Sequence, residues 1–244
     1  MKPFLFLGIR AQDVPADEEY AAVLRCTGLE ERDVRRVRLE RDELEPLDLA
    51  DWSGLVIGGG PWNVSDPEEA KAERQRRGEA RLRSLARQVV EADFPTLGAC
   101  YGVGTFGTLP GGVVDRTHAE PIGPMAIELS EAGRADQLLG VLPATFTALL
   151  GHQEAVSRLP DGATLLASSA TCPVQAFRLC RNVYATQFHP ELDVPGIVAR
   201  IRAYRDFGYF APHEADDVVA RARAAVVTEP PRLLARFVEL FARR

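Results

Sequence analysis

The sequence predicts an α/β protein with a doubly wound, flavodoxin-like open sheet flanked by helices and a C-terminal helical extension. Three observations predict this fold. Short apolar runs alternate with amphipathic segments over the first hundred residues, short strand patterns follow between 113 and 187, and helical patterns end the chain. A length of 244 residues fits one such domain of roughly 200 residues plus an appendage.

The first half of the chain alternates strand and helix patterns. Four short segments predict strands: residues 4–9, 34–39, 54–57 and 95–99. The segment 34–39 alternates apolar residues with Arg, which indicates a half-exposed strand. A helix is expected over 16–26, because apolar residues recur at helical spacing and Gly28 follows as a stop signal. A second helix is expected over 65–91, starting at the capping residue Ser65 with Pro67 in its first turn, and with a break at Gly78.

The second half predicts short strands and then helices. Five apolar segments separated by Gly or Pro turns predict strands: residues 125–129, 145–149, 164–168, 176–178 and 183–187. Three helical patterns follow at 195–206, 213–225 and 231–243, and the last has an apolar face that should pack on the domain. We therefore predict a catalytic domain over 1–194 and a helical extension over 195–244 packed on the same domain. We expect the extension to be structural or partner-facing, because every motif residue precedes position 192.

Charge and composition exclude several classes of protein. A net charge of −6 argues against a nucleic-acid partner. No apolar run approaches the roughly 20 residues of a membrane span, and the apolar N-terminus is too short for a secretory signal, so no membrane association and a cytoplasmic location are expected.

The cysteines and isolated histidines outside the motifs are expected to have no chemical role. The four cysteines contain no CxxC pair, so we expect reduced thiols and no metal site. Cys26 is expected in a helix core and Cys172 and Cys180 as buried, unreactive thiols. His118 and His213 are expected at the surface.

Cys100 is the strongest candidate nucleophile. It lies in Gly98-Ala99-Cys100-Tyr101-Gly102, directly after a predicted buried strand. Small residues around a reactive side chain at a strand-to-helix corner are typical of a nucleophile elbow. The start of the following helix is expected to favour the thiolate. A buried structural cysteine is the alternative interpretation.

Two further motifs follow predicted strands. His189 and Glu191 lie two positions apart in an extended segment, which suits a base and the carboxylate that orients it. Three glycines and Pro61 follow the strand at 54–57, where backbone N–H groups could turn toward an oxyanion. The carboxyl ends of strands in an open α/β sheet face one crevice, so these motifs should meet there.

These motifs together resemble the class I (triad-type) glutamine amidotransferases, of the stand-alone kind similar to the glutaminase domain of GMP synthase. The resemblance covers about residues 3–194. It rests on GGGP at 58–61, GACYG at 98–102, GHQEAVSRLPDGATLLASS at 151–169, CPVQAF at 172–177 and QFHPE at 187–191.

The resemblance implies a residue for each role. Cys100 would be the nucleophile, His189 the acid and base, and Glu191 its partner. Backbone N–H groups of Gly60 and Tyr101 would form the oxyanion hole. The candidate substrate contacts are Gly59, Gly104, His152 and Gln153. The implied reaction releases glutamate and ammonia through a γ-glutamyl thioester and needs no metal or organic cofactor.

One position departs from the family pattern. Gly104 stands four residues after the nucleophile, where the family usually has a glutamine that helps to hold the substrate. We expect glycine to leave extra volume beside Cys100 and to weaken the binding of free glutamine.

Three functions remain open from the sequence. The first is a glutaminase that passes ammonia to a synthetase partner protein, because the sequence contains no ATP-binding synthetase domain. The second is a γ-glutamyl peptide or amide hydrolase that uses the same three residues. The third is a non-catalytic binding module, which an intact Cys-His-Glu set disfavours.

Overall fold

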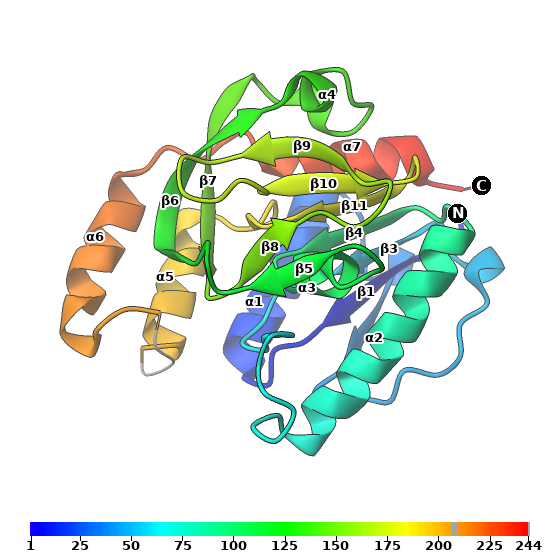
Figure 1. The fold of residues 1–244 in the computed structure, drawn as a ribbon, viewed down its shortest axis with the longest axis horizontal. Coiled ribbons are helices and arrows are strands. Elements are labelled where there is room, and N and C mark those ends of the chain that lie inside the picture. The colour runs from blue at the N-terminus through cyan, green and yellow to red at the C-terminus, as the bar shows by residue number, and fades with distance from the viewer. Residues whose placement is uncertain (206–208, 244) are drawn as a thin grey trace.

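The computed structural model describes residues 1–205 and 209–243 and is built around one mixed sheet (Figure 1). In the described residues this sheet has nine strands in the order β2-β1-β3-β4-β11-β10-β9-β6-β7. Its parallel half contains β2 (Val34–Arg38), β1 (Phe4–Gly8), β3 (Gly54–Ile57), β4 (Thr96–Ala99) and β11 (Val183–Thr186). Its antiparallel half contains β10 (Ala176–Leu179), β9 (Thr164–Ser168), β6 (Glu120–Leu129) and β7 (Thr145–His152). The predicted doubly wound open sheet is confirmed.

Helices cover both faces of the parallel half. Strand β1 shows why: Phe4 and Phe6 pack in one core cluster with α1 (Asp13–Thr27) and α7 (Pro231–Phe241), while Leu5 and Leu7 pack on the opposite face. That opposite face is covered by α2 (Glu73–Glu91) and α3 (Tyr101–Gly107). Alternate side chains of a strand point to opposite faces, so one short strand contributes to both cores.

Smaller elements complete the fold. Helices α5 (Val194–Ala203) and α6 (Ala215–Ala224) pack around a third apolar cluster that includes Ile122 of β6 and Leu149 of β7. Strands β5 (Val113–Asp115) and β8 (Ala155–Arg158) pair with each other, and α4 (Glu131–Arg134) is a single turn. The two ends of the chain lie side by side (Figure 1), where the Lys2 N–H donates to the Arg243 carbonyl at 2.9 Å.

The helix expected over 65–91 begins eight residues later than predicted, at Glu73. Tertiary contacts hold the preceding segment in turns. The Glu154 carboxylate accepts the N–H groups of Val64 and Ser65 at 2.9 and 2.8 Å. Gly78 does not break the helix. The ring of Trp62 lies 2.6 Å from where a Cβ on Gly78 would stand, so glycine makes room for the ring.

Other helix ends and side chains also differ from expectation. Helix α5 ends at Ala203, and residue 206, where we expected its end, lies outside the described residues. A 3-10 turn, Pro212–Glu214, precedes α6. The strands β5 and β8 and the helix α4 were not predicted. Cys180 is exposed, so its predicted burial is wrong.

The other predicted side-chain positions vary in burial. Cys172 is buried as predicted and Cys26 is half-buried. His213 is exposed and His118 is half-buried. Within the part of the chain that the structure describes, no helix is long and apolar enough to cross a membrane.

Candidate active site

Cys100 stands at a sharp corner between β4 and α3. Its backbone has φ +53° and ψ −87°, a conformation that L-residues adopt only under strain. The Cys100 N–H donates to the Thr186 carbonyl of β11 at 2.7 Å, which fixes the corner to the sheet. A Cβ on Gly98 would lie 2.7 Å from the Cα of Gly102, so the turn requires glycine there. The corner therefore has the geometry of a nucleophile elbow.

His189 follows β11, and hydrogen bonds fix both its backbone and its side chain. Its N–H donates to the Leu149 carbonyl at 3.0 Å. Its Nδ1 lies 2.8 Å from Oε1 of Glu191, which places the imidazole proton on Nδ1. The nitrogen Nε2 is thus left to accept a proton.

Gly59 joins the two motifs in space. A Cβ on Gly59 would lie 3.1 Å from both the Cys100 Cβ and the His189 Nε2, and only 2.4 Å from the His189 Cε1. Cys100 and the His189 imidazole therefore both lie beside Gly59 and line the same pocket. Gly60 lines the same pocket and packs against Ile9, whose side chain would lie 2.5 Å from an added Cβ.

Burial controls the protonation of the reacting groups. It raises the pKa of the Cys100 thiol to about 12, although Arg10 and Arg200 act in the opposite direction. It lowers the pKa of His189, and this outweighs the opposing effect of Glu191. The resting state is therefore a thiol beside a neutral imidazole. The expected preference for a thiolate is not what this environment gives.

Glu191 remains ionised beside His189. Burial alone would raise the pKa of its carboxyl group, but its interactions with His189 and Arg200 hold that pKa far below the usual value. The Arg200 guanidinium donates to Oε1 of Glu191 at 2.8 Å. Arg200 belongs to α5, so the helical extension, which we expected to be structural or partner-facing, reaches this site.

The pocket over Cys100 is narrow. It has a volume of about 30 Å³, enough for one or two water molecules. Its walls include residues that sequence reasoning missed: Arg10, Ile122, Leu192, Arg200, Tyr204 and Tyr209. No local pattern marks these residues, because Arg10, Ile122 and the group between 192 and 209 lie far apart in the sequence.

Gly104 does not open volume beside Cys100. A Cβ at this position would lie 2.9 Å from Oε1 of Glu154 and 3.1 Å from both methyl groups of Val64. The side chains of Glu154 and Val64 already fill the space that we expected to be empty. The prediction of extra volume is wrong, because the turns after β3 fold over α3.

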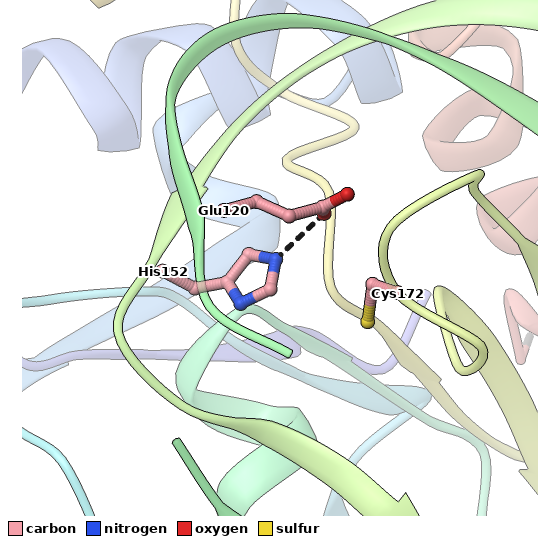
Figure 2. A group of neighbouring side chains, drawn as sticks. All are labelled: Glu120, His152 and Cys172. Carbon is pink, nitrogen blue, oxygen red and sulfur yellow. Dashed lines mark hydrogen bonds and ion pairs between the residues drawn. The ribbon is translucent and has the colours of Figure 1, made fainter. Parts of the chain in front are cut away.

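His152 and Gln153 are not among the residues that line this pocket. His152 is buried in a polar cluster with Glu120 (Figure 2), and its Nε2 lies 2.9 Å from Glu120 Oε2. Its Nδ1 faces the Glu154 carbonyl at 2.9 Å. Gln153 faces Asn63, whose Nδ2 donates to Gln153 Oε1 at 3.4 Å.

Among the residues that the structure describes, two groups of side chains have the donor types of a metal site. Glu120, His152 and Cys172 form one (Figure 2), but both oxygens of Glu120 already accept hydrogen bonds. The donors are His152, Gln175, Ser169 and Thr171. Both carboxylate oxygens of Glu120 are thus already engaged, and a metal ion would have to displace several of these hydrogen bonds.

The second group is Glu19, His189 and Glu191. Two buried arginines contact these carboxylates: Arg10 binds Glu19 at 3.0 Å, and Arg200 binds Glu191 at 2.8 Å. The cationic side chains neutralise the anionic ligands that a metal ion would use, so this donor set fits ion pairs better than a cation.

Comparisons with known proteins agree with this arrangement. The profile of the glutamine amidotransferase class-I family matches residues 20–195. One subunit of the glutamine-hydrolysing GMP synthase of Thermoplasma acidophilum is 31% identical over 172 residues, which cover 70% of this chain and 76% of that protein. The GMP synthase of Aeropyrum pernix is 34% identical over 57% of this chain, but the match spans only 24% of that longer protein.

Solved structures show the same fold. A glutamine amidotransferase from Thermotoga maritima superposes with a TM-score of 0.74 at 18% identity and covers the whole of both chains. One from Methylobacillus flagellatus gives a TM-score of 0.70 at 19% identity, over 99% of this chain and 94% of that one. The fold therefore places the chain among α/β proteins with a mixed open sheet. The chain belongs to the class-I glutamine amidotransferase family, which is a family of enzymes.

Proposed function

We propose that this protein hydrolyses the side-chain amide of glutamine through a γ-glutamyl thioester on Cys100, releasing ammonia and glutamate. The observation that carries the proposal is the meeting of Cys100 and His189 beside Gly59, with His189 Nδ1 bound to Glu191 at 2.8 Å. A thiol, a base and an orienting carboxylate in this order are the parts that acyl transfer needs.

The proposed steps follow from the protonation states. His189 Nε2 takes the proton of the Cys100 thiol as the sulfur attacks the amide carbon. This matters because burial holds the pKa of the thiol at about 12, so little thiolate exists before the base acts. His189 then gives its proton to the departing ammonia and later activates the water that cleaves the thioester.

The remaining roles are assigned to backbone and wall groups. We assign the oxyanion to the N–H groups of Gly60 and Tyr101, which belong to the two segments that flank the nucleophile. Glu191 stabilises the imidazolium that forms in each step. Gly59 shapes the site by leaving room for the imidazole. Because Gly104, His152 and Gln153 do not line the pocket, we assign them to its support and not to substrate contact.

We also propose a synthetase partner that takes up the ammonia. The support is the relative from Thermoplasma acidophilum, whose name describes it as one subunit of a GMP synthase. The γ-glutamyl peptide alternative loses its main argument, because the volume at Gly104 that would admit a bulky leaving group is filled by Glu154 and Val64.

The test is to incubate the purified protein with glutamine and to measure ammonia, glutamate and the intact mass of the acyl-enzyme. Cys100→Ala should abolish all three signals while keeping the fold. Cys180→Ala is the matched control, because Cys180 also has a positive φ of 50° but is exposed and outside the pocket. Ammonia release that survives in Cys100→Ala would disprove the proposed mechanism.

A further inference from the structure

A network of buried charged side chains surrounds His189 and Glu191 of the candidate triad. Arg200 of α5 places Nη2 2.8 Å from Glu191 Oε1 and 3.3 Å from Glu19 Oε1. Its Nη1 lies 3.1 Å from His189 Nδ1. The exposed fractions of the Arg200, Glu19 and Glu191 side chains are only 6%, 1% and 3%. One guanidinium therefore touches both members of the histidine–carboxylate pair.

Glu19 connects this guanidinium to a second one. Its Oε1 accepts from Arg10 Nε at 3.0 Å and from Arg200 at 3.3 Å. Arg10 follows β1 and also donates to the Tyr204 hydroxyl at 3.0 Å. Segments from β1, α1 and α5 therefore meet at one carboxylate.

The charges of these buried side chains balance. Arg10 and Arg200 supply two cations, and Glu19 and Glu191 supply two anions. The neutral imidazole of His189 adds no charge to the set. Removal of one charged member leaves an uncompensated buried charge, which is costly. The arrangement thus restricts Glu191 to one position, because Oε1 is held by Arg200 as well as by His189.

We propose that Arg200 is a positioning residue of this site, supplied by the helical extension, which sets the orientation and basicity of His189 through Glu191 and is itself held by Glu19. The inference rests on the proposed function, and it adds a residue that lies outside the Cys-His-Glu motifs. It also gives the extension a role in the reaction, since α5 contributes the guanidinium.

The sign of the pH effect follows from the groups that face His189. These are Glu191 on its own segment, Arg200 from α5, Arg10 after β1, Glu19 from α1 and Cys100 after β4. Burial lowers the pKa of His189, the charges of Arg200 and Arg10 lower it further, and Glu191 raises it. Loss of Arg200 should therefore raise the pKa of His189, and loss of the Glu19 charge should lower it.

The experiment measures kcat and KM for glutamine against pH in Arg200→Met, Arg200→Lys and Glu19→Gln. In Arg200→Met we expect kcat to fall roughly 10²-fold, the effect of about 1 Å of misplacement, with KM little changed. The acidic limb of the kcat/KM profile should move to higher pH. Arg200→Lys should bring the limb back toward the natural position, because the charge is restored. Glu19→Gln should move it in the opposite direction, to lower pH.

Arg25→Met is the matched control. Arg25 also links α1 to the start of α5, through Asp193 at 3.0 Å, but both side chains of this ion pair are largely exposed. Its loss should change neither kcat nor the pH profile. Natural activity in Arg200→Met, or a loss of activity without a shift of the limb and without recovery in Arg200→Lys, would overturn the proposal. If Arg200→Met does not fold, the proposal would be overturned by an acidic limb of the kcat/KM profile that stays at its natural pH in both Arg200→Lys and Glu19→Gln.

A failure of the proposed function can be told apart from a failure of this inference. If the natural protein releases no ammonia from glutamine, the proposed function fails by itself. The pH dependence of Cys100 alkylation by iodoacetamide, measured by peptide mass mapping, then reports the pKa of His189 without a substrate. Opposite shifts in Arg200→Met and Glu19→Gln support the role of Arg200, and identical profiles refute it.

Discussion

At Gly59 there is no room for a side chain between Cys100 and His189. An added Cβ would lie 2.4 Å from the His189 Cε1, well inside van der Waals contact, and 3.1 Å from the Cys100 Cβ. Either the imidazole or the backbone after β3 would have to move. The spacing of the two reacting groups is thus set by a residue that has no side chain of its own.

We therefore expect Gly59→Ala to lower kcat by about 10²-fold or more, because a displacement of the imidazole by about 1 Å costs that much. The measurement is the rate of ammonia release, with circular dichroism to check the fold. Gly102→Ala is the control: its Cβ would meet nothing closer than 4.0 Å, and alanine favours the helix α3. Equal activities of the two variants would show that the imidazole does not depend on Gly59.

Gly104 has a structural explanation in place of a functional one. The position faces Glu154 Oε1, whose carboxyl group holds the turns at Val64 and Ser65. We expect Gly104→Gln to lower the free energy of unfolding by about 1–3 kcal/mol through overpacking, without improving KM for glutamine. Chemical denaturation and steady-state kinetics measure the two quantities. A stable variant with a lower KM would restore the idea that this position selects the substrate.

At the scale of elements, α7 packs beside α1 and covers the rest of that face of the sheet. Leu233, Leu234 and Phe237 are buried there. The ring of Phe237 lies 6.1 Å from that of Phe4, centre to centre, and 3.2 Å from where a Cβ on Gly54 would stand. The helix is therefore part of the main core and not an appendage on the surface.

We expect Phe237→Ala to reduce the free energy of unfolding by about 3–5 kcal/mol, the usual cost of removing a buried phenylalanine. Phe241→Ala is the control, because Phe241 is only half-buried, and it should cost clearly less. Thermal and chemical denaturation provide the measurement. Similar losses in both variants would mean that α7 is not anchored through Phe237. The boundary at residue 194 stays a prediction, which limited proteolysis can test.

At the scale of the whole molecule, buried carboxylates make the fold sensitive to acid. Burial would raise the pKa of Glu120, but hydrogen bonds from His152, Thr171 and Ser169 hold it below the usual value. The pKa of Glu191 is also lowered, because His189 and Arg200 outweigh its burial. A carboxyl group whose pKa is lower in the folded state stabilises the fold above its unfolded pKa and loses this contribution as the pH falls.

The free energy of unfolding should therefore decrease as the pH drops below about 4.3, the ordinary pKa of glutamate. Glu154 acts in the opposite direction, because burial raises its pKa. We expect Glu120→Gln to be less stable than the natural protein at neutral pH, but to lose less stability on acidification. Urea denaturation at a series of pH values measures both effects. An unchanged slope against pH in Glu120→Gln would contradict the assignment.

Much of the fold and the candidate triad could be predicted from local patterns. The apolar run over 54–57 coincides with β3, and the segment over 164–168 coincides with β9, because a buried strand needs only a few consecutive apolar residues. Cys100, His189 and Glu191 could be selected because each follows a predicted strand, and the carboxyl ends of parallel strands meet at one edge of a sheet. Residue order alone therefore determined the fold class, the family and the candidates for chemistry.

Only the tertiary structure decided what surrounds these candidates. Arg10, Glu19 and Arg200 carry no local motif, and they lie in one network because β1, α1 and α5 are brought together in space. The late start of α2 and the filled space at Gly104 have the same origin, since the Glu154 carboxylate reaches the backbone of a segment about 90 residues earlier in the chain. Local periodicity reports which residues are buried, but long-range ion pairs and hydrogen bonds depend on which buried surfaces meet, and that is determined only when the chain has folded.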